Sequence, residues 1–234
     1  MSSPTEWMKN EYNDLVKKGF DWKPPVIGGP STGRTVIDGK ERIMLCANNY
    51  LSMSNHPKVK QAAIDAVKSH GAGSGSVRPI AGNMDIHNEL EETIARFKNR
   101  EAALYYQTGF AVNSGLIPQL AGKNDAIISD QLNHGSIIDG VRLSGVKKEN
   151  RTIYAHNDMG ELEDRLKEAT NKCEKTLVIS DGVFSMDGDI APLDEITKLA
   201  KEENLSADVF GPLAFDNSIS KKSAAIKGIK NLVA

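Results

Sequence analysis

Apolar residues in the middle of the chain follow two periods. Four short apolar runs have the length of buried strands and are too short for core helices. They lie near 102–107, 126–129, 152–155 and 176–180. Helical spacing marks four further segments, near 110–121, 136–143, 159–170 and 192–203. This alternation predicts an α/β fold with a mostly parallel sheet and crossover helices.

The first 45 residues follow a different pattern, and we expect an N-terminal helix and hairpin there. A serine, a proline and a glutamate within residues 3–6 are typical of a helix start. The Asp38-Gly39 pair between two short apolar runs predicts a tight hairpin. Further helices are expected at 57–70 and 85–99.

Composition narrows the function classes. The chain has 29 Lys and Arg against 31 Asp and Glu, so it lacks the basic excess of a general nucleic-acid binder. The two cysteines, Cys46 and Cys173, form neither a disulfide framework nor a metal-ligand pattern. No apolar run approaches the ~20 residues that span a bilayer, and the N-terminus lacks a secretory signal. We therefore expect a cytoplasmic protein with no membrane or nucleic-acid partner.

Unusual polar residues follow three of the predicted strands. After the first, Gly109 allows a sharp turn. The N–H groups of Gly109 and Phe110 then face outward at the start of a helix. Such a turn suits an anion, although it is also an ordinary way to join a strand to a helix.

The second strand is followed by His134, which is a candidate acid–base residue or simply a polar residue satisfied by its neighbours. Asp130 lies nearby, but no second histidine or cysteine stands at ligand spacing, so we expect no metal site. The third strand leads into residues 180–189, with several acids and serines, where a glycine-rich turn with solvated carboxylates is the alternative. Because parallel strands end at one sheet edge, the three ends together predict one ligand site.

Five stretches of the chain together resemble the α-oxoamine synthases. These are enzymes of the aspartate aminotransferase fold (fold type I) that depend on pyridoxal 5′-phosphate (PLP). The stretches are Asn48–Leu51, Gly73–Gly82, Ile128–Arg142, Asn157–Met159 and Asp181–Pro192. The resemblance implies that residues 46–204 form a partial PLP-binding large domain, and that the protein works as a homodimer.

The resemblance also assigns roles to five residues. Gly109 and Phe110 would hold the cofactor phosphate, and His134 would stack on the pyridine ring as the catalytic histidine. Ser185 would hydrogen-bond near the phenolic oxygen of PLP. Asn48 would contact the amino-acid substrate near its carboxylate.

Within this family the chain most resembles enzymes that condense glycine with acetyl-CoA to give 2-amino-3-oxobutyrate and CoA, the glycine C-acetyltransferases. The 8-amino-7-oxononanoate synthases of the biotin pathway are the alternative.

Two residues that this chemistry needs are not found in the chain. They are the aspartate of an Asp-x-x-His motif, which pairs with the pyridine nitrogen, and the lysine that holds PLP as an imine. The last histidine is His156, and residues 205–234 are predicted to be a divergent tail, with no small C-terminal domain. We expect a truncated, inactive enzyme. A non-catalytic partner of an active subunit is the other hypothesis.

Overall fold

The computed structural model describes residues 4–202, and within them the chain divides into two compact units at the Gly82–Asn83 boundary. The predicted tail at 205–234 and the serine of the predicted first helix cap lie outside the described residues. No helix among residues 4–202 has the length and apolar character that crossing a membrane requires.

The first unit contains the predicted N-terminal helix and hairpin. Its helices and strands are α1 (Glu6–Lys17), β1 (Arg34–Ile37), β2 (Lys40–Ile43), η1 (Met53–Asn55), α2 (Pro57–His70) and η2 (Arg78–Gly82). The hairpin turns at Asp38 and Gly39, with φ of 50° and 74°, which is the left-handed geometry that an Asp-Gly pair favours. The predicted hairpin is therefore confirmed.

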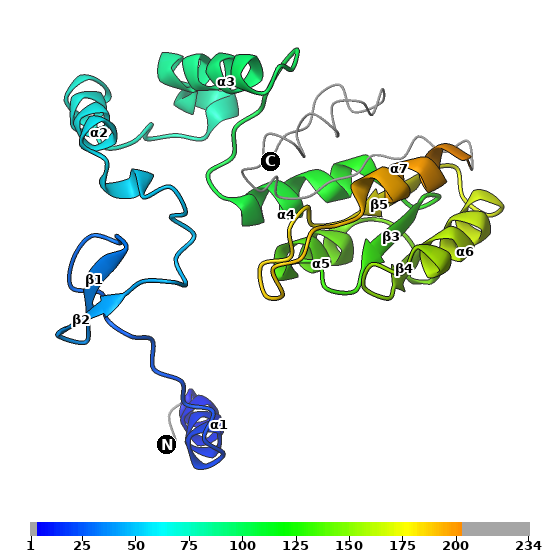
Figure 1. Ribbon diagram of the computed structural model, residues 1–234, viewed down its shortest axis with the longest axis horizontal. Helices are drawn as coiled ribbons and strands as arrows, with labels where there is room; N and C mark the ends of the chain where they lie inside the picture. Colours follow the sequence, from blue (N-terminus) through cyan, green and yellow to red (C-terminus); the bar gives the residue numbers. More distant parts are fainter. Residues whose placement is uncertain (1–3, 203–234) are drawn as a thin grey trace. The chain divides into compact units, whose positions relative to one another are not determined.

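The second unit is a three-stranded parallel sheet with helices on both faces (Figure 1). Its elements are α3 (Asp85–Phe97), α4 (Gly109–Leu120), β3 (Ala126–Asp130), α5 (Gly135–Leu143), η3 (Lys148–Asn150), β4 (Arg151–Tyr154), α6 (Met159–Thr170), β5 (Thr176–Ile179) and α7 (Leu193–Glu202). The strand order is β4-β3-β5, with Ile128 opposite both Thr152 and Val178. The predicted α/β fold with a parallel sheet is confirmed, and the carboxyl ends of the three strands meet at one edge.

Successive residues of β3 point to opposite faces of the sheet and enter two separate cores. Ile128 packs with Leu162 of α6 and Ile196 of α7 on one face. Ile127 packs with residues of α4 and α5, such as Ile117, on the other face. Because both of their faces are covered, β3 and β5 are buried at every residue and are mainly apolar, as central parallel strands are. Each large apolar side chain buried here contributes ~1.5–3 kcal/mol.

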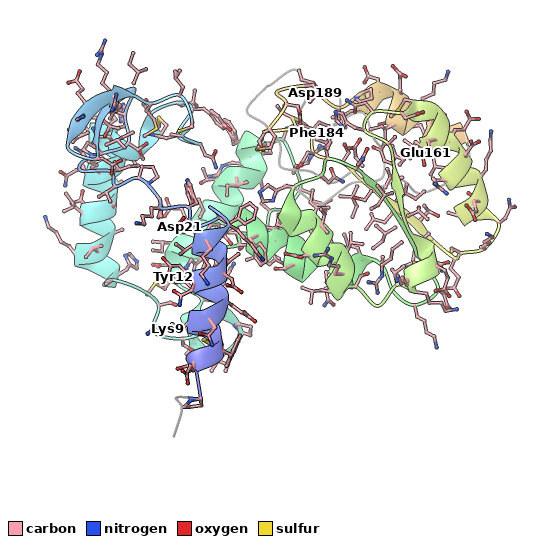
Figure 2. All side chains as sticks on the ribbon, turned by 90° about the horizontal axis from the view of Figure 1, so that it is seen from below. Lys9, Tyr12, Asp21, Glu161, Phe184 and Asp189 are labelled. Carbon is pink, nitrogen blue, oxygen red and sulfur yellow. The ribbon has the colours of Figure 1, made fainter. Side chains whose placement is uncertain are left out.

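Helix α6 begins where the sequence provides a cap. The Asp158 side chain accepts a hydrogen bond from the Glu161 N–H at 2.9 Å, which satisfies a free donor of the first turn. Glu161, which is labelled in Figure 2, in turn accepts the Ala155 N–H at 2.7 Å and pairs with Arg165 at 2.8 Å. This arrangement fixes the path of the chain between β4 and α6.

The prediction of a strand at 102–107 is wrong. These residues are irregular, and the Tyr105 N–H donates to Glu91 Oε1 of α3 at 2.8 Å instead of pairing with a strand. The apolar run has strand composition, but no strand of the described residues lies beside it to complete a ladder.

Candidate functional site

The turn at the start of α4 has the geometry of an anion site. Thr108 caps the helix, because its Oγ1 accepts the Ala111 N–H at 3.1 Å. The N–H groups of Gly109 and Phe110 have no acceptor among the described residues. No atom beyond its chain neighbours and its own helix backbone lies within 4 Å of the place where a Gly109 side chain would begin, and both residues are exposed, so the turn is open to solvent. Two free donors at a helix N-terminus favour a bound anion.

Helices α4 and α5 pack backbone to backbone, and this contact links the turn to His134. A Cβ atom on Gly140 would lie 2.4 Å from the Asn113 carbonyl oxygen, so only glycine allows so close an approach. Nearer the sheet edge, Asn113 Nδ2 donates to Ser136 Oγ at 2.9 Å. Ser136 then contacts the ring of His134, at 2.7 Å from its Nδ1.

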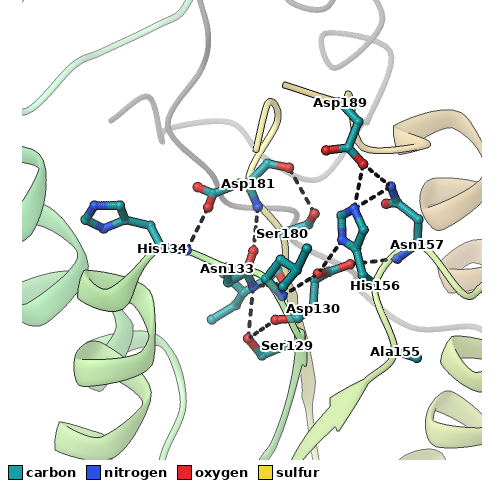
Figure 3. Close-up of polar contacts among 12 residues, drawn as sticks. Ser129, Asp130, Asn133, His134, Ala155, His156, Asn157, Ser180, Asp181 and Asp189 are labelled. Carbon is teal, nitrogen blue, oxygen red and sulfur yellow. Dashed lines mark hydrogen bonds and ion pairs between the residues drawn. The ribbon is translucent and has the colours of Figure 1, made fainter. Parts of the chain in front are cut away.

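His134 is the N-cap of α5. Its Nδ1 accepts the Ser136 N–H at 3.1 Å, so the neutral ring carries its proton on Nε2. The main-chain N–H of His134 donates to Asp181 Oδ2 at 2.7 Å, while the ring points away from Asp181 and is exposed (Figure 3). The imidazole is thus held in one orientation with its outer face available.

Asn133 ties the ends of β3 and β5 together directly below His134. Its buried side chain donates to Ile179 O at 2.7 Å and to Ser129 Oγ at 2.9 Å, and it accepts the Asp181 N–H at 2.7 Å. Asp181 is buried as well. Burial raises the pKa of its carboxyl group, although the hydrogen bond from His134 opposes the shift. Asp181 Oδ1 has no partner among the described residues.

A second polar cluster on the same edge was missed by sequence reasoning. Asp130, at the end of β3, accepts the N–H groups of Leu132 at 2.8 Å and Asn157 at 3.0 Å. His156 lies between two carboxylates, with its Nδ1 2.9 Å from Asp130 Oδ1 and its Nε2 2.5 Å from Asp189 Oδ2 (Figure 3). Burial lowers the pKa of His156, but the hydrogen bonds to both carboxylates outweigh it and raise the pKa. The available signal was its position just after a parallel strand, with Asp130 at the end of β3 and Asp189 on the segment after β5.

Ser185 lies on an exposed loop after β5, which we call the 182–190 loop. Val183 and Ile190 form an antiparallel bridge across its base. Phe184, just before Ser185, is 1% exposed and meets the His156 ring edge-on, with ring centroids 4.4 Å apart.

Asn48 lies in the first unit, on the exposed segment between β2 and η1. The next residue, Asn49, anchors this segment by donating to Ser31 O at 2.7 Å and accepting the Ser54 N–H at 3.2 Å. In the second unit, the structure joins the Gly109–Phe110 turn to His134 through the two packed helices. It joins His134 to the start of the 182–190 loop through Asp181.

Residues 40–207 match the sequence model of the family named aminotransferase class I and II. The chain belongs to this family. Enzymes of the family depend on PLP, as the sequence predicted, and the parallel α/β fold is that of fold type I. Within residues 4–202, no group of three or more His, Cys, Asp or Glu side chains is arranged to hold a metal ion.

Comparison with individual members of the family identifies a more specific similarity, to a named enzyme. The chain is 50% identical over 197 residues to the 8-amino-7-oxononanoate synthase of Alkaliphilus metalliredigens. The matched residues are 84% of this chain and 49% of that protein. It is also 50% identical over 199 residues to the same-named enzyme of Treponema denticola, covering 85% of this chain and 50% of that protein. The chain thus spans about half the length of the curated relatives it matches.

Solved structures agree with this grouping. A serine palmitoyltransferase from S. paucimobilis with bound PLP–myriocin aldimine matches with a TM-score of 0.77 at 31% identity, covering 88% of this chain and 51% of that one. The 8-amino-7-oxononanoate synthase of Francisella tularensis matches with a TM-score of 0.55 at 29% identity, covering 65% of this chain and 41% of that one.

The second unit offers groups that fit PLP. The phosphate of PLP needs hydrogen-bond donors. The free N–H groups of Gly109 and Phe110 provide them at an exposed helix N-terminus. The pyridine ring of PLP needs an aromatic surface, and the exposed imidazole of His134 is held rigidly through Nδ1.

Proposed function

We propose that this chain carries the PLP-binding part of a C-acyltransferase of the α-oxoamine synthase family, with the reaction of the 8-amino-7-oxononanoate synthases. One observation carries the proposal: two relatives with that name are 50% identical to this chain over 84–85% of its length. The reaction of glycine with acetyl-CoA, which the sequence predicted first, has less support, because these relatives bear the name of the alternative.

The name of the product defines the substrate classes. In 8-amino-7-oxononanoate the amino group is on C8 and the keto group on C7, so the reaction joins these two carbons. C8 and C9 are what alanine leaves after losing its carboxylate as carbon dioxide. C1 to C7 form the acyl group of a dicarboxylic acid, which a thioester delivers with release of the free thiol. We therefore propose alanine and a seven-carbon dicarboxylic acyl thioester as substrates.

Roles for five residues follow from this proposal. The N–H groups of Gly109 and Phe110 hold the phosphate of PLP, and the His134 ring stacks on the pyridine. Ser185 hydrogen-bonds near the phenolic oxygen, and Asn48 contacts the substrate carboxylate in a homodimeric enzyme. When bound, PLP supplies an electron sink for the carbanion at the α-carbon of the amino acid. This chain contributes binding and orientation.

Two substitutions at Gly109 test the phosphate site. Gly109→Pro removes one N–H donor at the first position of α4, where proline is tolerated, and the preceding Thr108 is already extended, as a residue before proline should be. Gly109→Ala keeps the N–H and places a similar first carbon in the same open space. In a fluorescence titration we expect Gly109→Pro to weaken PLP binding about tenfold, the effect of one charge-assisted hydrogen bond.

The alanine variant should bind PLP nearly as well as the wild type, and pyridoxal without its phosphate should bind weakly to every form. Equal PLP affinity in the two variants would show that this turn does not bind the phosphate.

The reaction is tested by thiol release. The assay compares alanine plus the seven-carbon dicarboxylic thioester with glycine plus acetyl-CoA. It uses the 234-residue chain and a chimera that adds the part of the A. metalliredigens enzyme that this chain does not match. The chimera should release thiol faster from the first pair, and preference for glycine and acetyl-CoA would reject the assignment.

A further inference from the structure

The cluster of Asp130, His156 and Asp189 has no role in the proposed chemistry, yet it joins the ends of β3 and β4 to the 182–190 loop. We infer that His156 is a positioning residue that fastens the 182–190 loop, and with it Ser185, to the ends of β3 and β4. The consequence for PLP rests on the proposed function, whereas the attachment of the loop does not.

One side of this attachment is rigid. The Asp130 side chain is fully buried, with an exposed fraction of 0%, and it accepts the N–H groups of Leu132 and Asn157 in addition to its contact with His156. A carboxylate with these partners has little freedom to turn. It therefore holds the His156 ring in one plane, with Nε2 directed at Asp189.

The other side is the loop. Asp189 Oδ2 lies 2.5 Å from His156 Nε2 and accepts from Asn157 Nδ2 at 3.1 Å. The Phe184 N–H donates to the Asp189 carbonyl at 2.9 Å, so these two residues close the base of the loop. Both touch His156, Phe184 with its ring and Asp189 with its carboxylate. Ser185 follows Phe184 directly, so its position depends on this base.

The attachment depends on the charge of the ring. Only the protonated imidazole donates to Asp130 and Asp189 at once, since the neutral ring has one N–H. The charged groups that face the ring are Asp130 from β3 and Asp189 from the loop, with the buried Tyr154 hydroxyl near Asp130. As the pH rises and the ring loses a proton, one carboxylate loses the hydrogen bond that His156 donates to it. The partly exposed Asp189, whose side chain is 41% exposed, can turn to solvent where Asp130 cannot.

Hydrogen exchange of the loop amides tests the inference without any cofactor. The amides of Phe184 and Gly188 both donate within the loop, so their protection reports its closure. In the wild type we expect protection, corrected for intrinsic rates, to fall as the pH rises through the titration of His156. His156→Gln and Asp189→Asn should exchange about tenfold faster at pH 6, the loss of one charge-assisted hydrogen bond, with little pH dependence left.

Asp187→Asn is the matched control. It removes the same charge from an exposed position on the same loop that has no hydrogen bond among the described residues. It should keep the protection and the pH dependence of the wild type. If His156→Gln unfolds, the exchange rates of Asp189→Asn alone decide whether the inference holds. Wild-type protection in folded Asp189→Asn, or equal effects of Asp187→Asn and Asp189→Asn, would overturn the inference.

A PLP titration of the same variants separates this inference from the proposed function. If no form of the chain binds PLP, the proposed function fails while the exchange result still decides the role of His156. If PLP binds, Asp189→Asn should weaken it several-fold more at pH 6 than at pH 9, and Asp187→Asn should not. Equal affinity of Asp189→Asn and wild type at both pH values would reject the role of His156 in placing Ser185.

Discussion

Gly140→Ala should loosen the contact between α4 and α5 on which the proposed phosphate turn and His134 depend. The new Cβ would lie 2.4 Å from the Asn113 carbonyl oxygen and 2.8 Å from Ile117 Cδ1. Favourable contacts begin near ~3.5 Å, so the helices must separate by about 1 Å. The isoleucine can rotate, but the carbonyl is backbone and cannot. Overpacking of this kind costs about 3 kcal/mol at its upper end, and the gain in helix propensity returns about 1 kcal/mol. We therefore expect a net loss of about 2 kcal/mol.

Urea denaturation measures this loss, and Gly135→Ala is the control. Gly135 lies in the same helix, but no atom is within 4 Å of its Cβ position, so alanine there should leave stability equal or slightly higher. With a denaturant slope of ~1–3 kcal/mol per molar, Gly140→Ala should shift the midpoint down by about 1 M. Its PLP affinity should fall as well, because the Asn113–Ser136 hydrogen bond beside His134 must lengthen. A midpoint for Gly140→Ala equal to that of Gly135→Ala would refute the reasoning.

Three more outcomes follow from the same unit. Asn133→Ala leaves buried main-chain groups without partners, so it should lower the free energy of unfolding by about 2–4 kcal/mol. Asn124→Ala, at an exposed site, should change it by less than about 0.5 kcal/mol in the same urea experiment. In the folded state the pKa of His156 is raised and that of Asp189 is lowered. Their ion pair therefore stabilises fully from about pH 4 to about pH 6.5, between the unfolded values. It is lost as the pH rises through the raised pKa of His156 or falls through the lowered pKa of Asp189. The stability difference between wild type and Asp189→Asn should thus be largest within that window, and a difference that stays flat to pH 9 would contradict this sign. Thr108→Ala removes the cap of α4 and should cost about 1 kcal/mol, whereas Thr108→Ser should recover most of it. Equal melting temperatures for these two variants would argue against the cap.

Local pattern was enough to predict three strands and the helices that cover them. β3, β4 and β5 lie within about two residues of the predicted runs. β3 and β5 are buried on both faces, which gives them an apolar composition that loops do not share, whereas β4 is partly exposed and has Ile153 and Tyr154 as its apolar residues. Residues 102–107 have a similar composition and still form no strand. A strand forms only where another strand lies beside it to pair with, and the apolar run itself does not reveal where such a partner lies.

Local pattern also indicated candidate site residues, whose roles stay predictions. His134 stands out because it follows the parallel strand β3, and a turn at such an end is a general ligand position. Gly109 was predicted from a strand at 102–107 that these residues do not form. The network of Asn133, Asp181 and His156 was not predictable, since it depends on side-chain rotamers and on the order β4-β3-β5. Sequence alone does not say that the loop after β5 lies next to the loops after both β3 and β4.

The strand order also explains how exposed loops can hold a precise geometry. Each loop is fastened by a side chain from a neighbouring strand end: Asn133 after β3 binds the main chain after β5, and Asp181 after β5 binds the His134 N–H. Asp130 of β3 likewise holds the Asn157 N–H after β4. These bonds form only in the observed register, because a slip by one residue would turn Asp130 to the other face of the sheet. The sheet therefore does more than support the site. Its register decides which side chains can reach across, and so how firmly the main chain at His134, where we propose that PLP binds, is held.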